Sequence, residues 1–195
     1  MVATDRKILL VDNYDSFTYI IREYLGQLYG FGRVDVVKND QISFEKARTY
    51  SGWILSPGPG LPHESGVLLD LVKSGMDHIP MLGICLGHQA IAEAAGAQLR
   101  NLGTVRHGHQ VRIKWLQSSE ISLGKGEYEN AGLYHSWVID EDSLTPNLTI
   151  LAKDESGHIM AIKYKDRPVF GVQFHPESIL TSGGSDLIGR FLSFL

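Results

Sequence analysis

PMLGICLGHQA (residues 80–90) holds the only cysteine of the chain, Cys85, between a short apolar run and a helix-forming segment. The run 80–84 predicts a buried strand, and a helix is expected from about residue 87 to 95. A tight turn between them crowds the backbone, so the neighbours of Cys85 must be small, as Gly83 and Gly87 are. Strand, sharp turn and helix in this order are typical of a nucleophile elbow, which exposes its central side chain at the end of a sheet.

Apolar runs alternate with helical patterns on the N-terminal side of this stretch, which predicts a parallel sheet covered on both faces. Strands are expected at 7–12, 34–38, 52–56 and 80–84, and helices at 16–29, 44–50, 66–74 and 87–95. The C-terminal half is rich in strands, expected at 111–115, 148–152, 158–164 and 168–174, before a last helix at 185–195. We therefore expect a single α/β domain over residues 1–195: an open doubly wound, mostly parallel sheet with helices on both faces and an antiparallel extension in the C-terminal half.

Composition argues against several classes of function. The net charge is −4 and Lys and Arg are scattered, so nothing favours nucleic acid or an anionic membrane as a partner. No segment approaches the roughly 18 apolar residues of a membrane span, and the apolar run 8–11 is too short for a secretory signal. One cysteine cannot form an internal disulfide, so a reducing compartment, the cytoplasm, is the simplest expectation.

Two interpretations of Cys85 remain open from these residues alone. A thiol at a helix N-terminus is favoured as the thiolate, and the backbone N–H of Leu86 is free to bind an oxyanion. Most isolated cysteines, however, are small buried core residues. The flanking glycines by themselves do not separate the nucleophile from the core residue.

A thiol nucleophile needs a base, and the base needs an orienting group. GVQFHPES (171–178) offers both, because Pro176 stops the expected strand and Glu177 can accept the imidazole N–H of His175. Without Cys85, a strand-end histidine beside a surface glutamate would be the alternative interpretation. His88 is expected to pack or to lie on the surface, and solvation is expected for His63, His78 and His158.

The loop SPGPGLP (56–62) follows the third expected strand and opens at the same sheet edge as Cys85. Its alternating residues Gly58, Pro59 and Gly60 give a rigid turn with a bare backbone, which suits the presentation of N–H groups to a ligand. His107 and His109 would share one face of a strand, but no third ligand is evident nearby. No metal site is expected.

Taken together, GICLGHQ, SPGPGLP and GVQFHPES resemble the class I glutamine amidotransferases, in the expected order and over nearly the whole chain. DNYDSFTY (12–19), YHS (134–136) and HPESILT (175–181) are similar to one branch, the glutaminase component (component II) of anthranilate synthase and of aminodeoxychorismate synthase. The resemblance implies hydrolysis of L-glutamine to glutamate and ammonia through a thioester on Cys85, with His175 as acid and base and Glu177 as its orienter.

The same resemblance implies how the substrate is held. The backbone N–H groups of Gly58 and Leu86 would form the oxyanion hole, and Gln89 would hold glutamine together with the main chain of Ser136 and Trp137. It also implies delivery of ammonia to a separate chorismate-binding synthase subunit, component I. No cofactor is expected in this chain, and Mg²⁺ is expected only in that partner.

The DNYDSF loop (12–17) is a candidate for the partner interface, and the alternative is that Asp15 or Ser16 caps the following helix. The chain also departs from the branch at two places. Leu133 and Trp137 stand where Arg and Leu are common, and HGHQV (107–111) stands where His-Gly-Lys-Thr-Ser is common. These departures bear on the shape of the pocket and on docking of the partner.

Other functions stay open at this point. Within the branch, the product pathway could be that of tryptophan, that of folate, or both. Glutaminases of GMP or carbamoyl phosphate synthesis share the elbow and the HPE motif. A catalytically silent subunit that only binds a partner is a third hypothesis, and a phosphoacceptor domain, suggested by ILLVDNYD (8–15), is a fourth.

Overall fold

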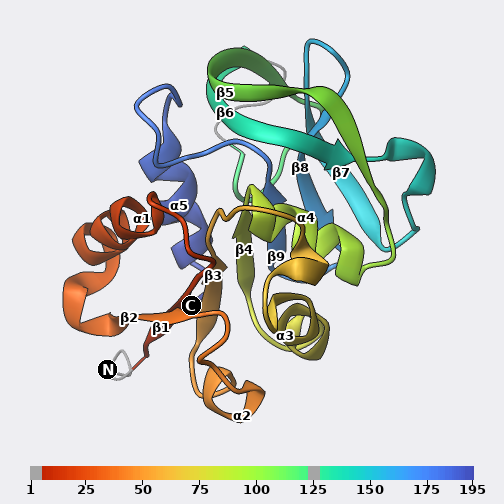
Figure 1. Ribbon diagram of the computed structural model, residues 1–195. Helices are drawn as coiled ribbons and strands as arrows, with labels where there is room; N and C mark the ends of the chain where they lie inside the picture. Colours follow the sequence, from red (N-terminus) through yellow and green to blue (C-terminus); the bar gives the residue numbers. More distant parts are fainter. Residues whose placement is uncertain (1–5, 123–127) are drawn as a thin grey trace.

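The structure is a computed structural model that describes residues 6–122 and 128–195 (Figure 1). Its nine-stranded sheet has the order β2-β1-β3-β4-β9-β8-β7-β5-β6. The strands of the first part run parallel to one another, and they are β2 (Val34–Lys38), β1 (Ile8–Asp12), β3 (Gly52–Leu55), β4 (Met81–Ile84) and β9 (Val169–Val172).

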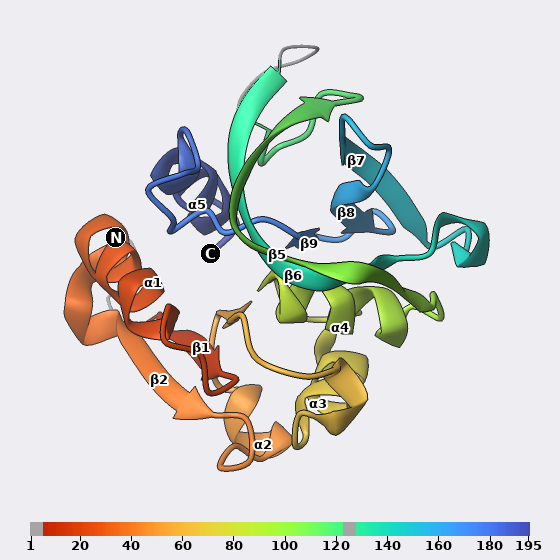
Figure 2. The same cartoon turned by 45° about the horizontal axis from the view of Figure 1, so that its top comes forward.

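The rest of the sheet is antiparallel and curls away from the parallel part (Figures 1 and 2). Its long hairpin arches over α4 in Figure 2 and brings the middle of the C-terminal half to the ends of the parallel strands. These strands are β8 (Ile159–Tyr164), β7 (Leu148–Asp154), β5 (Leu99–Trp115) and β6 (Tyr128–Ile139).

Helices cover both faces of the parallel part. One face carries α1 (Thr18–Leu25), which continues as a π-helical turn (Gly26–Gly30), and α5 (Gly184–Leu192). The other face carries α2 (Phe44–Ala47), α3 (Leu68–Gly75) and α4 (Leu86–Ala94) (Figure 1).

Two apolar clusters lie on the two faces of the sheet, and β1 shows why its sequence is continuously apolar. Ile8 and Leu10 point into the cluster under α1 and α5, whereas Leu9 and Val11 point into the cluster under α3 and α4. All four side chains are fully buried. A strand buried on both faces cannot alternate apolar and polar residues, so periodicity in these strands is lost and only the run of apolar residues remains.

The expected α/β fold with a parallel part and an antiparallel extension is confirmed, with corrections to the strands. The segment 168–174 was expected in the antiparallel extension, but β9 pairs in parallel with β4 and antiparallel only with β8. The expected strand 111–115 is the end of the 17-residue β5, and the 12-residue β6 was not among the strands expected from the apolar runs.

The loop before α1 does not use a side-chain cap of the expected kind. The helix begins at Thr18, and its N-cap Phe17 makes no side-chain cap bond. Asp15 instead accepts the N–H of Phe17 at 2.8 Å within the loop, and Asp12 accepts both the N–H of Tyr14 at 2.9 Å and the hydroxyl of Thr18 at 2.8 Å. Across 6–122 and 128–195, no helix is long and apolar enough to cross a membrane.

Candidate active site

Cys85 stands at the turn between β4 and α4 with a strained backbone. Its φ of +51° and ψ of −101° lie where non-glycine residues are rare. The turn is held because the N–H of Cys85 donates to the carbonyl of Val172 on β9 at 2.8 Å. A Cβ added to Gly83 would lie 2.4 Å from the backbone of Gly87, and one added to Gly87 would lie 2.4 Å from the carbonyl oxygen of Leu55. The small neighbours of the thiol are therefore a steric requirement of the elbow.

His175 and Glu177 form a buried pair in the segment that follows β9. The Nδ1 of His175 lies 2.7 Å from Oε1 of Glu177, so the ring donates this proton to the carboxylate. The Nε2 of His175 is buried without a hydrogen-bond partner among the described atoms. The carboxylate therefore fixes the ring so that Nε2 is left for the reacting thiol.

The segment carrying this pair is anchored to β6. The N–H of His175 donates to the carbonyl of Gly132 at 3.0 Å. The hydroxyl of Thr181 donates to the carbonyl of His175 at 2.6 Å and accepts the N–H of Gly132 at 2.9 Å. Two ring contacts, with Tyr134 and Phe17, complete the surroundings of the imidazole.

The electrostatics of the site favour a charged imidazole. Burial alone would lower the pKa of His175, but the adjacent Cys85 sulfur and the Glu177 carboxylate outweigh burial and raise the pKa to about 10. An imidazolium beside a thiol stabilises the thiolate form, which is the nucleophile. The arrangement contains the parts of a cysteine nucleophile, a base and an orienter, and these roles stay predictions.

A cavity of about 190 Å³ opens at the sulfur of Cys85. It is narrower than most sites for drug-sized molecules, and it suits a ligand of amino-acid size. The structure brings together in its wall seven of the residues that the sequence predicted, and it adds three more. The predicted residues are Gly58, Pro59, Gly60, Cys85, Gln89, Ser136 and Trp137, and the added ones are Val105, Tyr134 and His135.

Gly58 and Leu86, the predicted oxyanion-hole residues, are neighbours. A Cβ on Gly58 would lie 2.6 Å from Cδ2 of Leu86 and 2.7 Å from the carbonyl oxygen of Asn13, so only glycine fits there. Leu86 is the first residue of α4, where backbone N–H groups have no partner within the helix. Both residues are thus beside the nucleophile, and their role as oxyanion donors stays a prediction.

The predicted substrate-holding residues are connected through one carbonyl. The carbonyl oxygen of Trp137 accepts Nε2 of Gln89 at 3.1 Å and Nδ1 of His135 at 2.9 Å. These two bonds use both of its lone pairs. A main-chain contact from Trp137 to a substrate must therefore come from its N–H.

Sequence reasoning missed several residues of the site. Gln173 is fully buried and donates to the sulfur of Cys85 at 3.6 Å. It stands two residues before His175 at the end of a strand, and this spacing could have placed it on the same face. Val105 had no such signal, because it reaches the cavity from a bulge where five residues of β5 advance against two of β6, between the pairs Asn101–Trp137 and Arg106–His135.

The expectations for the histidines are met only in part. His88 is fully buried, in agreement with packing, and burial lowers its pKa to about 3. His158 is not solvated as expected, because only 14% of its side chain is exposed and Nδ1 lies 3.0 Å from Asp154. His107 and His109 do not share a face: a bulge at Gly108 places them opposite the consecutive residues Tyr134 and Leu133. Within the described ranges, no three His, Cys, Asp or Glu residues gather as a metal site.

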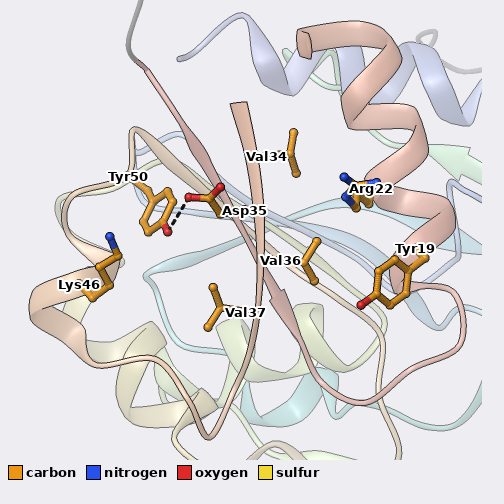
Figure 3. A pocket seen from close by; sticks show the side chains of 8 residues that line it. All are labelled: Tyr19, Arg22, Val34, Asp35, Val36, Val37, Lys46 and Tyr50. Carbon is orange, nitrogen blue, oxygen red and sulfur yellow. Dashed lines mark hydrogen bonds between the residues drawn. The ribbon is translucent and has the colours of Figure 1, made fainter. Parts of the chain in front are cut away.

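A larger hollow lies elsewhere, around the edge strand β2. Its volume is about 570 Å³, and side chains from both faces of the strand line it (Figure 3). Tyr50 donates to Asp35 there at 3.0 Å, and burial together with this carboxylate raises the pKa of Tyr50 to about 12. The wall has no cysteine, serine, threonine or histidine and wraps a sheet edge, so we assign the chemistry to the smaller cavity at Cys85.

Comparisons with known proteins concern the chain as a whole. The family model described as glutamine amidotransferase class-I matches residues 9–194. The aminodeoxychorismate/anthranilate synthase component 2 of Bacillus subtilis is 39% identical over 188 residues, which is 95% of each chain. The anthranilate synthase component 2 of Saccharolobus solfataricus is 40% identical, over 95% of this chain and 97% of its own. The bifunctional protein TrpGD of Thermotoga maritima is 38% identical over 96% of this chain, which spans only 32% of that protein.

Solved structures give the same fold. A Thermoplasma acidophilum protein assigned to GMP synthase superposes with a TM-score of 0.85 at 27% identity, over 97% of this chain and 93% of that chain. A glutamine amidotransferase of Thermotoga maritima superposes with a TM-score of 0.78 at 15% identity, over 97% of each chain. The second likeness concerns the fold alone.

Proposed function

The chain belongs to the class I glutamine amidotransferase family, and from this premise we propose that it is the glutaminase subunit of a chorismate-using synthase. The observation that carries the proposal is the cavity of about 190 Å³ with Cys85 in its wall. Behind the sulfur lies the pair His175–Glu177, 2.7 Å apart and buried. A nucleophile in the wall of a small pocket, with a base and an orienter buried next to it, supplies the parts that acyl transfer from an amide requires.

In the first half of the reaction, the Cys85 thiolate attacks the side-chain carbonyl carbon of glutamine. The carbonyl oxygen becomes an oxyanion, which the N–H groups of Gly58 and Leu86 stabilise. The C–N bond then breaks as the His175 imidazolium gives its Nε2 proton to the leaving nitrogen. Ammonia departs, and a γ-glutamyl thioester remains on Cys85.

In the second half, water replaces ammonia. The now neutral His175 takes a proton from water at Nε2, and the resulting hydroxide attacks the thioester. The tetrahedral intermediate collapses with release of glutamate, and the thiolate–imidazolium pair returns. Glu177 stays ionised throughout and holds Nδ1, so the same nitrogen serves as acid and as base.

The choice of branch rests on the relatives. Those named component 2 of anthranilate or aminodeoxychorismate synthase reach 38–40% identity over 95% or more of this chain, against 27% for the structure assigned to GMP synthesis. We therefore favour anthranilate formation, in the tryptophan pathway, with aminodeoxychorismate formation, in the folate pathway, as the second candidate. The name of the Bacillus subtilis relative joins both, so one subunit serving two synthases is a third outcome of the test.

A glutaminase of the component 2 kind implies a synthase subunit, component 1. The chemistry of ammonia gives the physical reason for their association. Ammonia released into neutral water is protonated and loses its nucleophilic lone pair, so direct transfer to the synthase keeps it reactive. The site edge offers a docking surface for this partner: Ile179, two residues after Glu177, is 98% exposed. Gln110 lies in HGHQV, the segment that differs from the pattern of the branch. Its side chain donates to the carbonyl of Leu180 at 2.8 Å and so supports the loop that carries Ile179.

The DNYDSF loop is the second part of the proposed docking surface. Tyr14 is exposed and has a φ of +64°, a strain that a bond from its N–H to Asp12 maintains. Phe17 of this loop contacts both the His175 ring, at 5.2 Å between centroids, and Tyr134, at 5.1 Å. A partner bound to this loop would therefore act, through Phe17, directly on His175, the proposed catalytic base.

We propose that the glutaminase steps use side chains and backbone of this chain without a bound cofactor, and that Mg²⁺ acts in the synthase partner. Covalent catalysis by a thiolate needs a proton carrier and an oxyanion hole, and both are assigned above. The proposed compartment is the cytoplasm, where a lone catalytic thiol stays reduced.

The test is glutamate release from glutamine, measured with the chain alone and with each chorismate-binding subunit of the same organism. Cys85→Ser should lower turnover by at least 1,000-fold, on the order of the loss of other nucleophiles, with an unchanged circular dichroism spectrum. Stimulation by the anthranilate-forming subunit places the chain in tryptophan synthesis, stimulation by the aminodeoxychorismate-forming subunit in folate synthesis, and stimulation by both makes it shared. Retained activity in Cys85→Ser contradicts the mechanism, and no stimulation by either subunit contradicts the branch.

A further inference from the structure

Gln173 is a buried polar residue that the mechanism above does not use. It follows β9 directly, it is 0% exposed, and its N–H donates to the carbonyl of Met160 at 2.9 Å. The chain bends at Gln173 and Phe174 as it leaves β9. Gln173 contacts the Cys85 sulfur from the same short segment that carries His175, whose charge that sulfur favours.

Hydrogen bonds connect Gln173 to the substrate side of the cavity. The Nε2 of Gln89 donates to the carbonyl of Trp137 and to Oε1 of Gln173, each at 3.1 Å. The Nε2 of Gln173 donates to Sγ of Cys85 at 3.6 Å. A single chain of bonds thus runs from β6, through α4, to the nucleophile.

Chemistry fixes the direction of this chain. A backbone carbonyl can only accept, so the amide nitrogen of Gln89, not its oxygen, must face Trp137. The second hydrogen of that nitrogen then meets Oε1 of Gln173, which leaves the amide nitrogen of Gln173 facing the sulfur. Rotating either amide by half a turn would place two acceptors, or two donors, against each other.

A second donor holds the Trp137 carbonyl. Nδ1 of His135 lies 2.9 Å from it, and burial lowers the pKa of His135 to about 4, so the ring is neutral and donates through Nδ1. Both lone pairs of the Trp137 carbonyl are therefore occupied. Of its two donors, it is Gln89 that also bonds Gln173, and it thereby fixes the orientation of the Gln173 amide. The Oε1 of Gln89 is left over for a donor group of the substrate.

We propose that Gln173 is a positioning residue of the glutaminase: its amide N–H stabilises the Cys85 thiolate, and Gln89 holds that amide in the donating orientation. This inference rests on the proposed function, and it adds a physical link between the substrate-binding strand and the nucleophile. The strand β6 that would bind glutamine and the sulfur that attacks it share one chain of hydrogen bonds. A shift of β6 on substrate or partner binding would change the donor at the nucleophile.

A test of this proposal must take account of the ionisable groups around the Cys85 sulfur. The His175 imidazolium faces it from the segment after β9, Glu177 acts on it through that ring, and the neutral His135 lies beyond on β6. Gln173 adds an uncharged donor to this set. Removing it weakens the stabilisation of the thiolate without changing any charge.

Alkylation by iodoacetamide reports on the thiolate alone. Cys85 is the only cysteine, so one mass adduct measures its rate from pH 5 to 10 in the isolated chain. In Gln173→Met, which keeps the length and loses the donor, we expect the midpoint of the rate profile to rise by about one pH unit. Gln117→Met is the matched control, because Gln117 is exposed and bonds only the carbonyl of Ile150 at 3.1 Å. Its profile should stay that of the wild type.

Gln89→Met tests the coupling. Alone it should shift the midpoint in the same direction by less, and combined with Gln173→Met it should add nothing, because it acts through Gln173. A merely structural role of Gln173 would lower the melting temperature and leave the midpoint in place, and that result overturns the proposal. Equal and additive shifts from the two variants overturn it as well. If Gln173→Met does not fold, an unshifted midpoint in a folded Gln89→Met overturns it instead.

Alkylation needs neither glutamine nor a synthase. Failure of the wild type to hydrolyse glutamine with any partner would contradict the proposed function and leave the alkylation result intact. The two hypotheses are therefore tested independently.

Discussion

His175 shows how three neighbouring groups set the behaviour of one ring. Burial opposes its positive charge, and the Cys85 sulfur and Glu177 carboxylate favour it, with a resulting pKa of about 10. Since the folded pKa lies above the unfolded value of about 6.5, the charged ring contributes its stabilisation fully below about pH 6.5. That contribution is lost as the pH rises through about 10.

Titration of His175 followed by NMR checks this electrostatic balance. We expect its ring protons to keep the protonated shift through pH 8 and to move between about pH 9 and 11. In Cys85→Ala the pKa should fall, because burial is then opposed by Glu177 alone. A titration near pH 6.5 in the wild type would mean that thiol and imidazole are both neutral at rest.

Gly83 provides a steric prediction at the same scale. A methyl group there would lie 2.4 Å from the backbone of Gly87, which cannot move without displacing α4. Gly83→Ala should therefore lower the free energy of unfolding by about 3 kcal/mol. Gly189→Ala is the control: Gly189 is in α5 with nothing within 4 Å of an added Cβ, so this change should be neutral or stabilise by up to about 1 kcal/mol. Urea denaturation measures the free energy of unfolding of both variants. Equal changes in the two variants would show that the elbow has room for a Cβ at residue 83.

At the scale of elements, the segment after β9 and the strand β6 act as one unit. Thr181 joins them, because its hydroxyl both donates to the carbonyl of His175 and accepts from the N–H of Gly132. Neither element could position the imidazole by itself. The proposed triad thus depends on a pairing between segments that are distant in the chain.

Thr181→Val keeps the shape of the side chain and removes both bonds. We expect a loss of about 2 kcal/mol in the free energy of unfolding and a roughly tenfold lower kcat with a nearly unchanged KM, because the base is held less firmly. Thr49→Val removes a local bond to the carbonyl of Lys46 on the exposed α2 side and should change neither quantity measurably. An unaltered kcat in Thr181→Val, with stability reduced, would show that the anchor serves the fold only.

At the scale of the whole molecule, the curled sheet creates one functional edge. The ends of the parallel strands, the arch of β5 and β6 and the loop 175–181 meet there (Figures 1 and 2). Exposed apolar side chains beside an active site are typical of protein contacts. The proposed glutamine site and the proposed docking surface therefore share this edge.

Ile179→Asp tests that surface in the complex with the chorismate-binding subunit. It should weaken association at least tenfold, because a charge enters an apolar contact, and it should leave glutamine hydrolysis by the isolated chain unchanged. Leu116→Asp, at an exposed residue just beyond the end of β5, is the matched control and should bind normally. Sedimentation of mixtures over a range of concentrations measures both. Wild-type affinity in Ile179→Asp would move the interface to another face.

The sequence by itself determined the α/β class, the family and the candidates for nucleophile, base and orienter. Each of these depends on a local pattern: apolar runs for buried strands, small residues around Cys85, and His175 and Glu177 two residues apart around a proline. Local patterns are readable because the atoms that cause them are close in the chain.

Only the tertiary structure decided the parallel pairing of β9, the bulge that brings Val105 to the cavity and the contact of Gln173 with Cys85. Gln173 and Cys85 are 88 residues apart, and their meeting follows from the register of β4 against β9. An apolar run predicts that a strand is buried, but it does not name the strand's neighbour or the direction of pairing. Those depend on the packing of the whole sheet, where the free energy is shared among many distant residues.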